Sequence, residues 1–334
     1  MAQRKDVSIQ FLARECGVSI ATVSRVINND KRVSAKTKAR VLDAMRQYGY
    51  EIPAAPTPSV RKVGIIIATE TSDYYMALVL KLHDFLKRAG YHVLMSSYDH
   101  DLDALPGVLE SMYDCGLSGL VLITSPYQAL RFRLDNRLPH VWIDCNDPHE
   151  LTEDICQVQS DQSYSGQLAA QELYRKGCVN PIMLCGPRLS HRSRERMAAF
   201  FEEYRRFGIS LGEDRVFQTP MTREILSESH QMIRYLVTKG VQFDGVFAVS
   251  DWRALGTYLA LTEQGIKVPE EVKIIGYDGV SIASRTVLNI TSVQQNIELI
   301  AQNAADLLLK QINHEEIKEK RVIIPTHILP GQTL

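Results

Sequence analysis

Short apolar runs alternate with segments of helical periodicity along most of the chain after residue 61. The first run covers residues 63–68, an amphipathic stretch follows it to Ala89, and a second run covers residues 90–95. Five more such runs lie at residues 119–123, 140–144, 181–185, 245–249 and 272–276. Strands that are apolar throughout are typical of parallel sheets covered by helices on both faces. The pattern predicts an α/β core, and more than six strands favour two lobes over one wide sheet.

Polar side chains follow several of these strands directly. They include residues 69–75, 124–125 and 250–252, together with the single residues Asp144 and Asp278. Open α/β sheets bind ligands beyond the carboxyl ends of their strands, and two facing lobes present two such edges to one cleft. The sequence therefore predicts a small-molecule site between the lobes.

The first fifty residues have the pattern of three short helices. Ser8 can cap the first, Gly17 allows a sharp turn, and Ser19 can cap the second. A third, amphipathic helix is expected from Ser34 or Ala35 to Tyr48, closing a small apolar core. Two helices joined by a glycine turn predict a helix-turn-helix, whose second helix enters the major groove of DNA.

The second helix carries side chains suited to reading DNA. Arg25 can donate two hydrogen bonds to guanine, whereas Ile20 and Ala21 can make only apolar contacts, such as with thymine methyl groups. Short polar side chains in the same region are expected to contact phosphates, which positions a helix without reading sequence. These residues are Ser8, Ser19, Thr22, Ser24 and Asn28.

A proline-rich linker separates this headpiece from the rest of the chain. Residues 53–61 contain three prolines and no apolar periodicity, which predicts an extended segment. We therefore divide the chain into a headpiece (residues 1–52), a linker (53–61) and a core (62–334). Within the core, we expect the first lobe at about 62–160 and 292–322, and the second at about 161–291 and 323–334.

The distribution of charge fits this division. The whole chain has a net charge of −1, but residues 1–50 hold ten basic and four acidic residues and carry +6, which leaves −7 for residues 51–334. A basic module on an acidic body suggests binding of a polyanion such as DNA, although a solvated basic face would give the same count.

The amino-acid composition further narrows the class of protein. With 45% hydrophobic and 23% charged residues, the chain is neither wholly disordered nor fibrous. It has no apolar run long enough to span a membrane and no secretory signal at its N-terminus, so we expect a cytoplasmic protein without a membrane partner. The six cysteines show no C-x-x-C spacing and are expected to be reduced thiols.

Residues 18–28, together with residues 33–37 and Gly49-Tyr50, resemble the headpiece of the lactose/galactose-repressor (LacI/GalR) family. The resemblance continues through Cys185-Gly186-Pro187, Arg196, and residues 249–256, 275–278 and 291–295, so that it covers essentially the whole chain. It implies a cytoplasmic transcription factor that binds a pseudo-palindromic operator as a dimer. It also implies a periplasmic-binding-protein-like core in which a metabolite shifts operator affinity.

The resemblance also assigns residues to the two sites. It adds Ser34, Thr37 and Tyr50 to the residues that contact DNA. In the core it implies an effector site with Tyr74 and Tyr75 as aromatic walls. The polar contacts of that site are carried over to Asp144, Asp161, Arg192, Arg196, Ser250, Asp278 and Gln295. Aromatic faces together with carboxylates, amides and guanidinium groups suit a sugar or sugar derivative.

Several of these residues have an alternative structural interpretation. Asp161 and Asp251 precede helices and could be N-caps, Asp278 could be a turn residue, and either tyrosine could belong to the core. The basic residues between Arg188 and Arg196 could lie on a solvated surface, or could accept a phosphorylated or carboxylated effector.

The chain departs from the family in three places. The family's linker usually forms a hinge helix whose leucine wedges into the minor groove, but residues 51–61 hold three prolines and no leucine, so we do not expect this chain to bend its operator in the usual way. Ser250 stands where many sugar-binding members have asparagine. Residues 322–334 lack a heptad helix, so we expect a dimer and not a tetramer.

We therefore predict a sequence-specific DNA-binding transcription regulator, expected to be a repressor, with a small metabolite in its interlobe cleft. The alternative is a cytoplasmic solute-binding or sensor protein with a vestigial DNA-binding head. Enzymatic activity is not expected, because the sequence contains no nucleophile elbow, Walker loop, dinucleotide-binding fingerprint or zinc-protease motif. We expect no cofactor and no metal.

Overall fold

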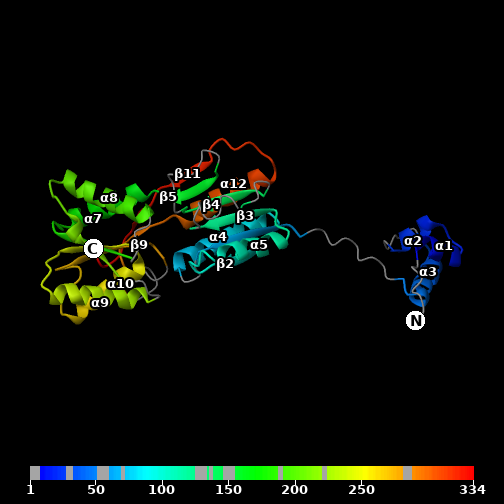
Figure 1. The fold of residues 1–334 in the computed structure, drawn as a ribbon, viewed down its shortest axis with the longest axis horizontal. Coiled ribbons are helices and arrows are strands. Elements are labelled where there is room, and N and C mark those ends of the chain that lie inside the picture. Colours follow the sequence, from blue (N-terminus) through cyan, green and yellow to red (C-terminus); the bar gives the residue numbers. More distant parts are fainter. Residues whose placement is uncertain are drawn as a thin grey trace. The chain divides into compact units, whose positions relative to one another are not determined.

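A computed structural model describes residues 8–27, 33–50, 60–68, 72–124, 134, 138–145, 155–186, 191–219, 224–280 and 288–334 (Figure 1). The chain forms two compact units, Met1–Val60 and Arg61–Leu334, which we describe separately. Residues 51–59 lie outside the described part of the chain, so the absence of a hinge helix stays a prediction.

The headpiece contains three helices, α1 (Ile9–Glu15), α2 (Ile20–Ile27) and α3 (Ala35–Tyr48). Each begins at a serine whose hydroxyl oxygen accepts a backbone N–H three residues later: Ser8 from Phe11 (3.2 Å), Ser19 from Thr22 (3.1 Å) and Ser34 from Thr37 (3.2 Å). Gly17 provides the turn at a φ of +59°, a conformation that costs glycine no steric strain. The three predicted helices and the predicted caps Ser8 and Ser19 are thus present, and Ser34 caps the third helix.

A small apolar core holds the three helices together. Leu12 of α1, Val23 of α2 and Val41 of α3 are fully buried, and smaller side chains from all three helices complete the cluster. Because each helix contributes only a few buried side chains, the fold of the headpiece depends on this shared core more than on any single helix.

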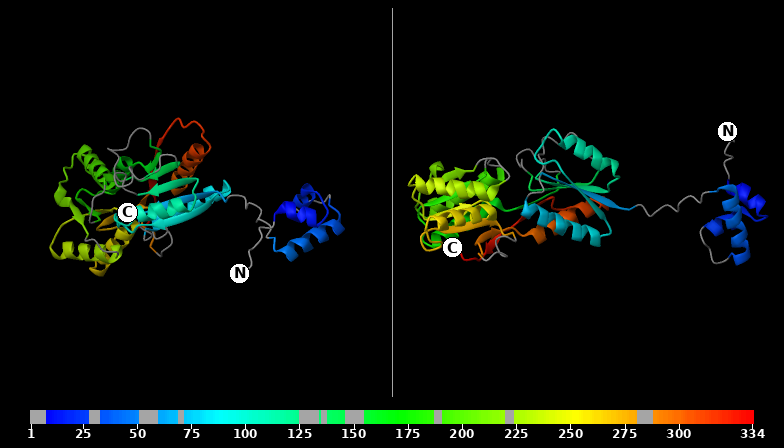
Figure 2. Two further views of the ribbon diagram at one scale, coloured as in Figure 1. Left: turned by 45° about the vertical axis from the view of Figure 1, so that its right-hand side comes forward. Right: turned by 90° about the horizontal axis from the view of Figure 1, so that it is seen from below.

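The first sheet of the core has six strands in the order β11-β5-β4-β3-β1-β2. Their bounds are β1 (Lys62–Ile67), β2 (His92–Ser97), β3 (Gly119–Ile123), β4 (His140–Ile143), β5 (Gln157–Ser160) and β11 (Arg321–Ile324). All pairings in this sheet are parallel. Helices α4 (Asp73–Arg88) and α12 (Ile297–Ile312) pack on one face, and α5 (Leu105–Asp114) packs on the other (Figure 2).

The second sheet also has six strands, in the order β12-β10-β9-β8-β6-β7. Their bounds are β6 (Pro181–Cys185), β7 (Val216–Gln218), β8 (Gly245–Ala248), β9 (Lys273–Asp278), β10 (Ser292–Gln294) and β12 (His327–Leu329). Only β12 runs antiparallel to its neighbour. Helices α7 (Gln162–Arg175) and α8 (His191–Arg206) cover one face, and α9 (Ile225–Thr238) and α10 (Asp251–Glu263) cover the other. A 3₁₀ turn, η1 (Glu213–Arg215), precedes β7.

The chain crosses between the two sheets at positions that differ by a few residues from the lobe boundaries expected from the sequence. Strand β10 pairs with β9 and β12, so residues 292–294 belong to the second lobe and not to the first. Strand β11 pairs with β5 through Ile324, so residues 323–324 belong to the first lobe. The chain therefore crosses between lobes after β5, after β10 and between β11 and β12, which brings the carboxyl ends of strands from both sheets to one cleft.

Candidate effector site between the two lobes

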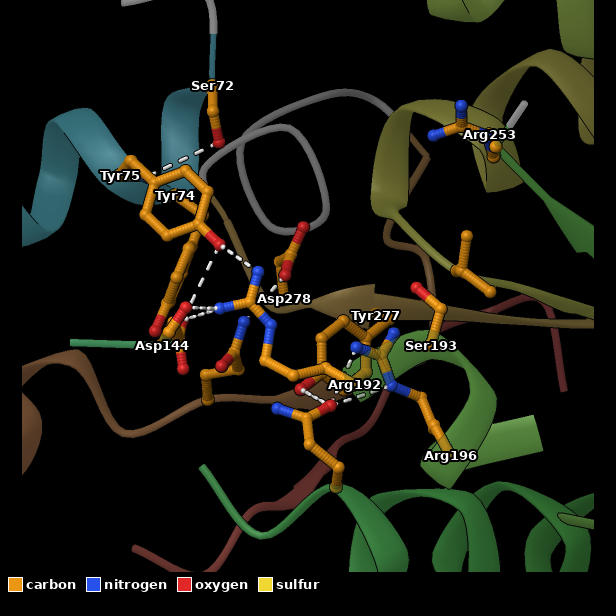
Figure 3. A pocket seen from close by; sticks show the side chains of 14 residues that line it. Ser72, Tyr74, Tyr75, Asp144, Arg192, Ser193, Arg196, Arg253, Tyr277 and Asp278 are labelled. Carbon is orange, nitrogen blue, oxygen red and sulfur yellow. Dashed lines mark hydrogen bonds and ion pairs between the residues drawn. The ribbon is translucent and has the colours of Figure 1, made fainter. Parts of the chain in front are cut away.

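A polar cavity of about 210 Å³ lies between the lobes of the core (Figure 3). The first lobe contributes the start of α4 and the end of β4, and the second contributes the ends of β6, β8 and β9 and the first turns of α7, α8 and α10. The lining residues are Ser72, Tyr74, Tyr75, Asp144, Gln162, Gly186, Arg192, Ser193, Arg196, Val249, Arg253, Tyr277, Asp278 and Gln295.

Arg192 links the two lobes across this cavity. From the first turn of α8 it donates through Nη2 to the Tyr75 hydroxyl (3.3 Å) and through Nη1 to the backbone oxygen of Asp144, and Nη1 also lies 3.7 Å from Asp144 Oδ2. Burial opposes the charged form of Arg192, but Tyr75 and Asp144 outweigh it and hold the pKa of Arg192 above its ordinary value. The contact is therefore an ion pair with hydrogen bonds, formed in a buried setting.

Two buried polar atoms of the first lobe face this cavity without a protein partner. Asp144 is 2% exposed, and its Oδ1 has no hydrogen bond among the described residues. The Tyr74 hydroxyl is likewise buried and unpartnered there, and burial raises the pKa of Tyr74 well above its ordinary value. Unsatisfied buried polar atoms are rare and costly, so both are positioned to bind hydroxyl groups of a ligand.

Arg196, on α8, lines the cavity on the side of the second lobe. Its Nε and Nη2 donate to Gln162 Oε1 at 3.1 and 2.7 Å, and its guanidinium carbon lies 3.4 Å from the centre of the Tyr277 ring. The Tyr277 hydroxyl donates to the same Gln162 oxygen (3.3 Å). These contacts fix the guanidinium plane, so Arg196 presents its remaining donor edge in a fixed orientation.

A hydrogen-bonded chain joins the carboxyl end of β5 in the first sheet to the carboxyl ends of β10 and β9 in the second. Ser160 Oγ donates to Gln295 Oε1 (2.6 Å), and Gln295 Nε2 donates to Asp278 Oδ1 (2.7 Å). Burial, followed by the nearby carboxylate of Asp251, raises the pKa of Asp278 to about 8. Asp278 is therefore largely protonated at neutral pH, and its carboxyl group can donate as well as accept a hydrogen bond.

The shifted pKa of Asp278 predicts a pH-dependent stability. Between its ordinary value of 3.8 and the value of about 8, folded Asp278 keeps a proton that the unfolded chain loses, so the free energy of unfolding falls as pH rises through this window. We expect Asp278→Asn to remove this component and to stabilise the empty protein at pH 8 by about 2–5 kcal/mol.

Thermal unfolding between pH 5 and pH 8.5 measures this effect. Asp306→Asn, at an exposed position on α12, is the control, and its melting temperature is expected to follow the wild type throughout. Identical pH dependence in the wild type and in Asp278→Asn would contradict the assignment.

Seven of the nine effector residues expected from the sequence line this cavity, and Asp161 and Ser250 do not. Asp161 caps α7, its Oδ1 accepting from Tyr164 N (2.8 Å), and Ser250 caps α10, its Oγ accepting from Arg253 N (3.4 Å). Asp251 is not a cap: its carboxylate accepts from Ser292 Oγ (2.6 Å) and Val280 N (2.9 Å), tying α10 to the second sheet.

Sequence reasoning did not single out several lining residues, of which three have clear chemistry. Gln162 follows the capping Asp161, Tyr277 precedes Asp278, and Arg253 lies in the first turn of α10. Neighbouring residues in sequence were named in each case, so a signal was present. The missing information was which side chain of each pair points into the cleft.

The residues expected to contact DNA differ in exposure: six are exposed (Ser8, Ser19, Ile20, Ala21, Arg25 and Ser34) and four are half-buried (Thr22, Ser24, Thr37 and Tyr50). On α2, Ile20 is 51% exposed, and Ala21 and Arg25 are exposed as well. The hydroxyls of Ser19 and Thr22 hydrogen-bond to each other (2.9 Å), and those of Ser34 and Thr37 do the same (2.9 Å). Ser8 caps α1, Ser24 is half-buried, and Tyr50 packs against the headpiece core. Asn28 lies outside the described residues.

The described part of the chain has neither a membrane-spanning helix nor a cluster of metal-binding side chains. No helix there is long and apolar enough to cross a membrane. Nor do three or more histidine, cysteine or acidic side chains of those residues gather into a group that could hold a metal ion.

A helix-turn-helix unit joined to a two-lobe core with a polar interlobe cavity defines a ligand-responsive DNA-binding protein. Comparison with known proteins agrees. The family model described as bacterial regulatory proteins, lacI family, matches residues 8–52, and the model of a periplasmic binding protein-like domain matches residues 170–334. The chain thus carries a lacI-family DNA-binding headpiece followed by a periplasmic-binding-protein-like domain. The relatives that span nearly the whole chain are repressors, and together with the helix-turn-helix headpiece they identify this protein as a DNA-binding transcription repressor with a metabolite-regulated core.

Individual relatives span nearly the whole chain. The ribose operon repressor of Halalkalibacterium halodurans is 26% identical, over 98% of this chain and 96% of that protein. The transcriptional repressor PurR of Haemophilus influenzae is 27% identical over 92% of both. Among solved structures, the complex of the transcriptional regulator CelR with cellobiose has a TM-score of 0.71 at 25% identity, covering 98% of this chain and 99% of that one. The Lac repressor dimer bound to operator and an anti-inducer has the same fold, with a TM-score of 0.74 at 21% identity and the same two coverages.

Proposed function

We propose that this repressor acts in the cytoplasm as a homodimer that binds a palindromic operator, and that a sugar or sugar derivative bound in the interlobe cavity changes its operator affinity. The observation that carries the proposal is a pair of buried polar atoms in the cavity lining, Asp144 Oδ1 and the Tyr74 hydroxyl, which have no hydrogen-bond partner among the described residues and share the cavity with Arg196. Such a set suits a ligand rich in hydroxyl groups. Two relatives are named for, or were solved with, sugars: ribose and cellobiose.

Contacts between the lobes provide a route from the cavity to the rest of the protein. Arg192 bridges to Asp144 and Tyr75, and outside the cavity Trp252 Nε1 donates to Asp73 Oδ2 (2.8 Å). A ligand that bonds to Asp144 or Arg192 competes with this bridge and so changes the preferred angle between the lobes. Binding can shift the equilibrium only because these contacts differ between the two states.

Dimerisation is supported by apolar side chains on the surface of the first lobe. Leu80 on α4 is 63% exposed, and Met95 on the edge strand β2 is 39% exposed. Burying such side chains against a second copy would stabilise a dimer by about 25 cal/mol for each Å² of apolar surface removed from water. A two-fold dimer presents two headpieces to a palindrome, whose half-sites have the same symmetry.

Fluorescence anisotropy on a palindromic fragment from the protein's own promoter tests the proposal. We expect specific binding at moderate salt, and a change in affinity on adding the sugar that most raises the melting temperature of the protein. A scrambled fragment of equal length is the control. Affinity no greater than for the scrambled DNA would overturn the proposal.

Light scattering tests the assembly separately. At micromolar concentration we expect a mass of twice the 37.7 kDa of one chain. A monomer under these conditions would show that paired headpieces are not pre-assembled.

A further inference from the structure

Arg253 is a buried arginine that lines the cavity. It is not among the polar groups proposed above to bind the hydroxyl groups of a ligand. It lies in the first turn of α10, is 8% exposed, and lines the same cavity as Arg192 and Arg196 (Figure 3). Its Nη1 donates to Ser250 Oγ (3.3 Å) and its Nη2 to Thr219 Oγ1 (3.5 Å), and its Nε has no partner among the described residues. Five N–H donors are thus served by two long bonds to neutral hydroxyls.

The three arginines of the cavity differ in how their charge is compensated. Arg192 has the carboxylate of Asp144, and Arg196 has the amide of Gln162 and the face of Tyr277. Arg253 makes no ion pair with any carboxylate of the described residues. Burial lowers the pKa of Arg253 below its ordinary value, and the charge of Glu228 opposes this only in part. A buried guanidinium whose desolvation is not repaid by a neighbouring anion is unfavourable.

The described side chains that are hydrogen-bonded to Arg253 are uncharged. Gly186, at the end of β6, lies against the guanidinium, since a Cβ there would stand 3.0 Å from Arg253 Nη2. The nearest acid of the cavity lining on this lobe, Asp278, has its pKa raised to about 8 by burial and so is largely uncharged at pH 7. The second-lobe side of the cavity therefore carries the charges of Arg196 and Arg253 without a full counter-charge.

We propose that the metabolite bound in this cavity carries an oxyanion, a carboxylate or a phosphate, and that Arg253 binds it, with Arg196 on the neighbouring wall. This inference rests on the proposed effector site and narrows its ligand to an acidic sugar derivative. The anion would supply the missing partner of the guanidinium, which binds oxyanions through paired N–H donors. The sugar hydroxyls would then lie toward Asp144 and Tyr74 on the first lobe.

Thermal unfolding of the full chain with simple anions tests the assignment. The probes are inorganic phosphate and acetate, added at constant ionic strength, because each is small enough to occupy the oxyanion position alone. We expect at least one of them to raise the melting temperature of the wild type, and Arg253→Met to weaken that response by roughly tenfold or more in anion concentration. The anion that acts distinguishes a phosphate ligand from a carboxylate.

A matched control and a second readout separate binding from structure. Arg234→Met, at an exposed position on α9, is expected to respond to both anions as the wild type does. In buffer without either anion, Arg253→Met is expected to melt at the same temperature as the wild type or a few degrees higher, because an uncompensated buried charge has been removed. An arginine with a purely structural role would instead leave the variant several degrees less stable.

The proposal is overturned if neither anion stabilises the wild type more than Arg253→Met, or if that variant is the less stable protein without anions. Operator binding is measured on the same samples, so that failure of the anionic-ligand proposal can be distinguished from failure of the proposed function. Loss of the anion effect with intact operator binding and an intact response to a neutral sugar refutes only the anionic ligand. Absence of operator binding in the wild type refutes the proposed function instead.

Discussion

Replacing Arg25 with alanine is expected to weaken specific operator binding by about 5- to 150-fold, the range that corresponds to the ~1–3 kcal/mol of one bidentate contact between arginine and guanine. Arg25 lies on the exposed face of α2, the second helix of the helix-turn-helix, beside the exposed Ile20 and Ala21. It makes no contribution to the apolar core of the headpiece, so the variant should fold normally. The effect should be much smaller on a scrambled DNA fragment, because non-specific binding depends on phosphates and not on base edges.

Arg46→Ala provides the control for this experiment. Arg46 lies in the last turn of α3, is 80% exposed and is 3.6 Å from Asp43. Replacing Arg46 removes the same positive charge from the headpiece as replacing Arg25, but it leaves α2 unchanged. Equal losses of affinity in the two variants would mean that Arg25 acts only through net charge, and unchanged promoter occupancy in Arg25→Ala would refute the assignment of α2 as the reading helix.

Replacing Arg196 with methionine is expected to abolish the response to the effector, with at least roughly a hundredfold loss of effector affinity. The guanidinium of Arg196 is fixed by Gln162 and the Tyr277 ring, so its donor edge is pre-organised and little ordering entropy is lost on binding. Removal also leaves Gln162 Oε1 with only the Tyr277 hydroxyl, which should lower stability by about 1–3 kcal/mol. Operator binding without effector should be retained, because Arg196 is remote from the headpiece in sequence and belongs to the other folding unit.

Arg194→Met controls for the loss of positive charge on the same helix. Arg194 lies on the exposed side of α8, two residues before Arg196, and does not line the cavity. Its effector response should match the wild type within about twofold, as for most surface substitutions. A full response in Arg196→Met, measured as the shift of operator affinity with effector concentration, would place the ligand elsewhere in the protein.

The headpiece could be predicted in detail because its signals are local. Ser8, Ser19 and Ser34 each cap the helix that follows them, as their positions in the sequence indicate. Six of the seven apolar strands of the core could be predicted for a similar reason, since burial on both faces leaves a continuous run in the sequence. The seventh, β2, lies at a sheet edge and is only partly buried, although its sequence is also apolar. Strands β5, β7, β10, β11 and β12 were not found, because they are three or four residues long, less apolar, and form only by pairing with distant partners.

The location of the cavity could be predicted from the sequence better than the individual residues that line it. Asp144 and Asp278 follow strands directly, and both face the cleft. At helix starts the same reasoning does not resolve neighbours: Asp161 and Ser250 form caps, while Gln162 and Arg253, one and three residues later, line the cavity. Whether a residue caps its helix or faces a ligand depends on the direction of the helix relative to the other lobe, which no local pattern encodes.

The thermodynamic linkage between effector binding and operator binding offers the most direct test of the proposed function. Operator affinity of the full-length protein is measured with and without saturating effector, and effector affinity is measured with and without saturating operator. If a metabolite in the cleft and duplex DNA on the headpiece act through one equilibrium, both pairs of measurements must change by the same factor, about 5- to 150-fold in systems of this kind. Independent affinities, with neither ligand altering the binding of the other, would contradict the account.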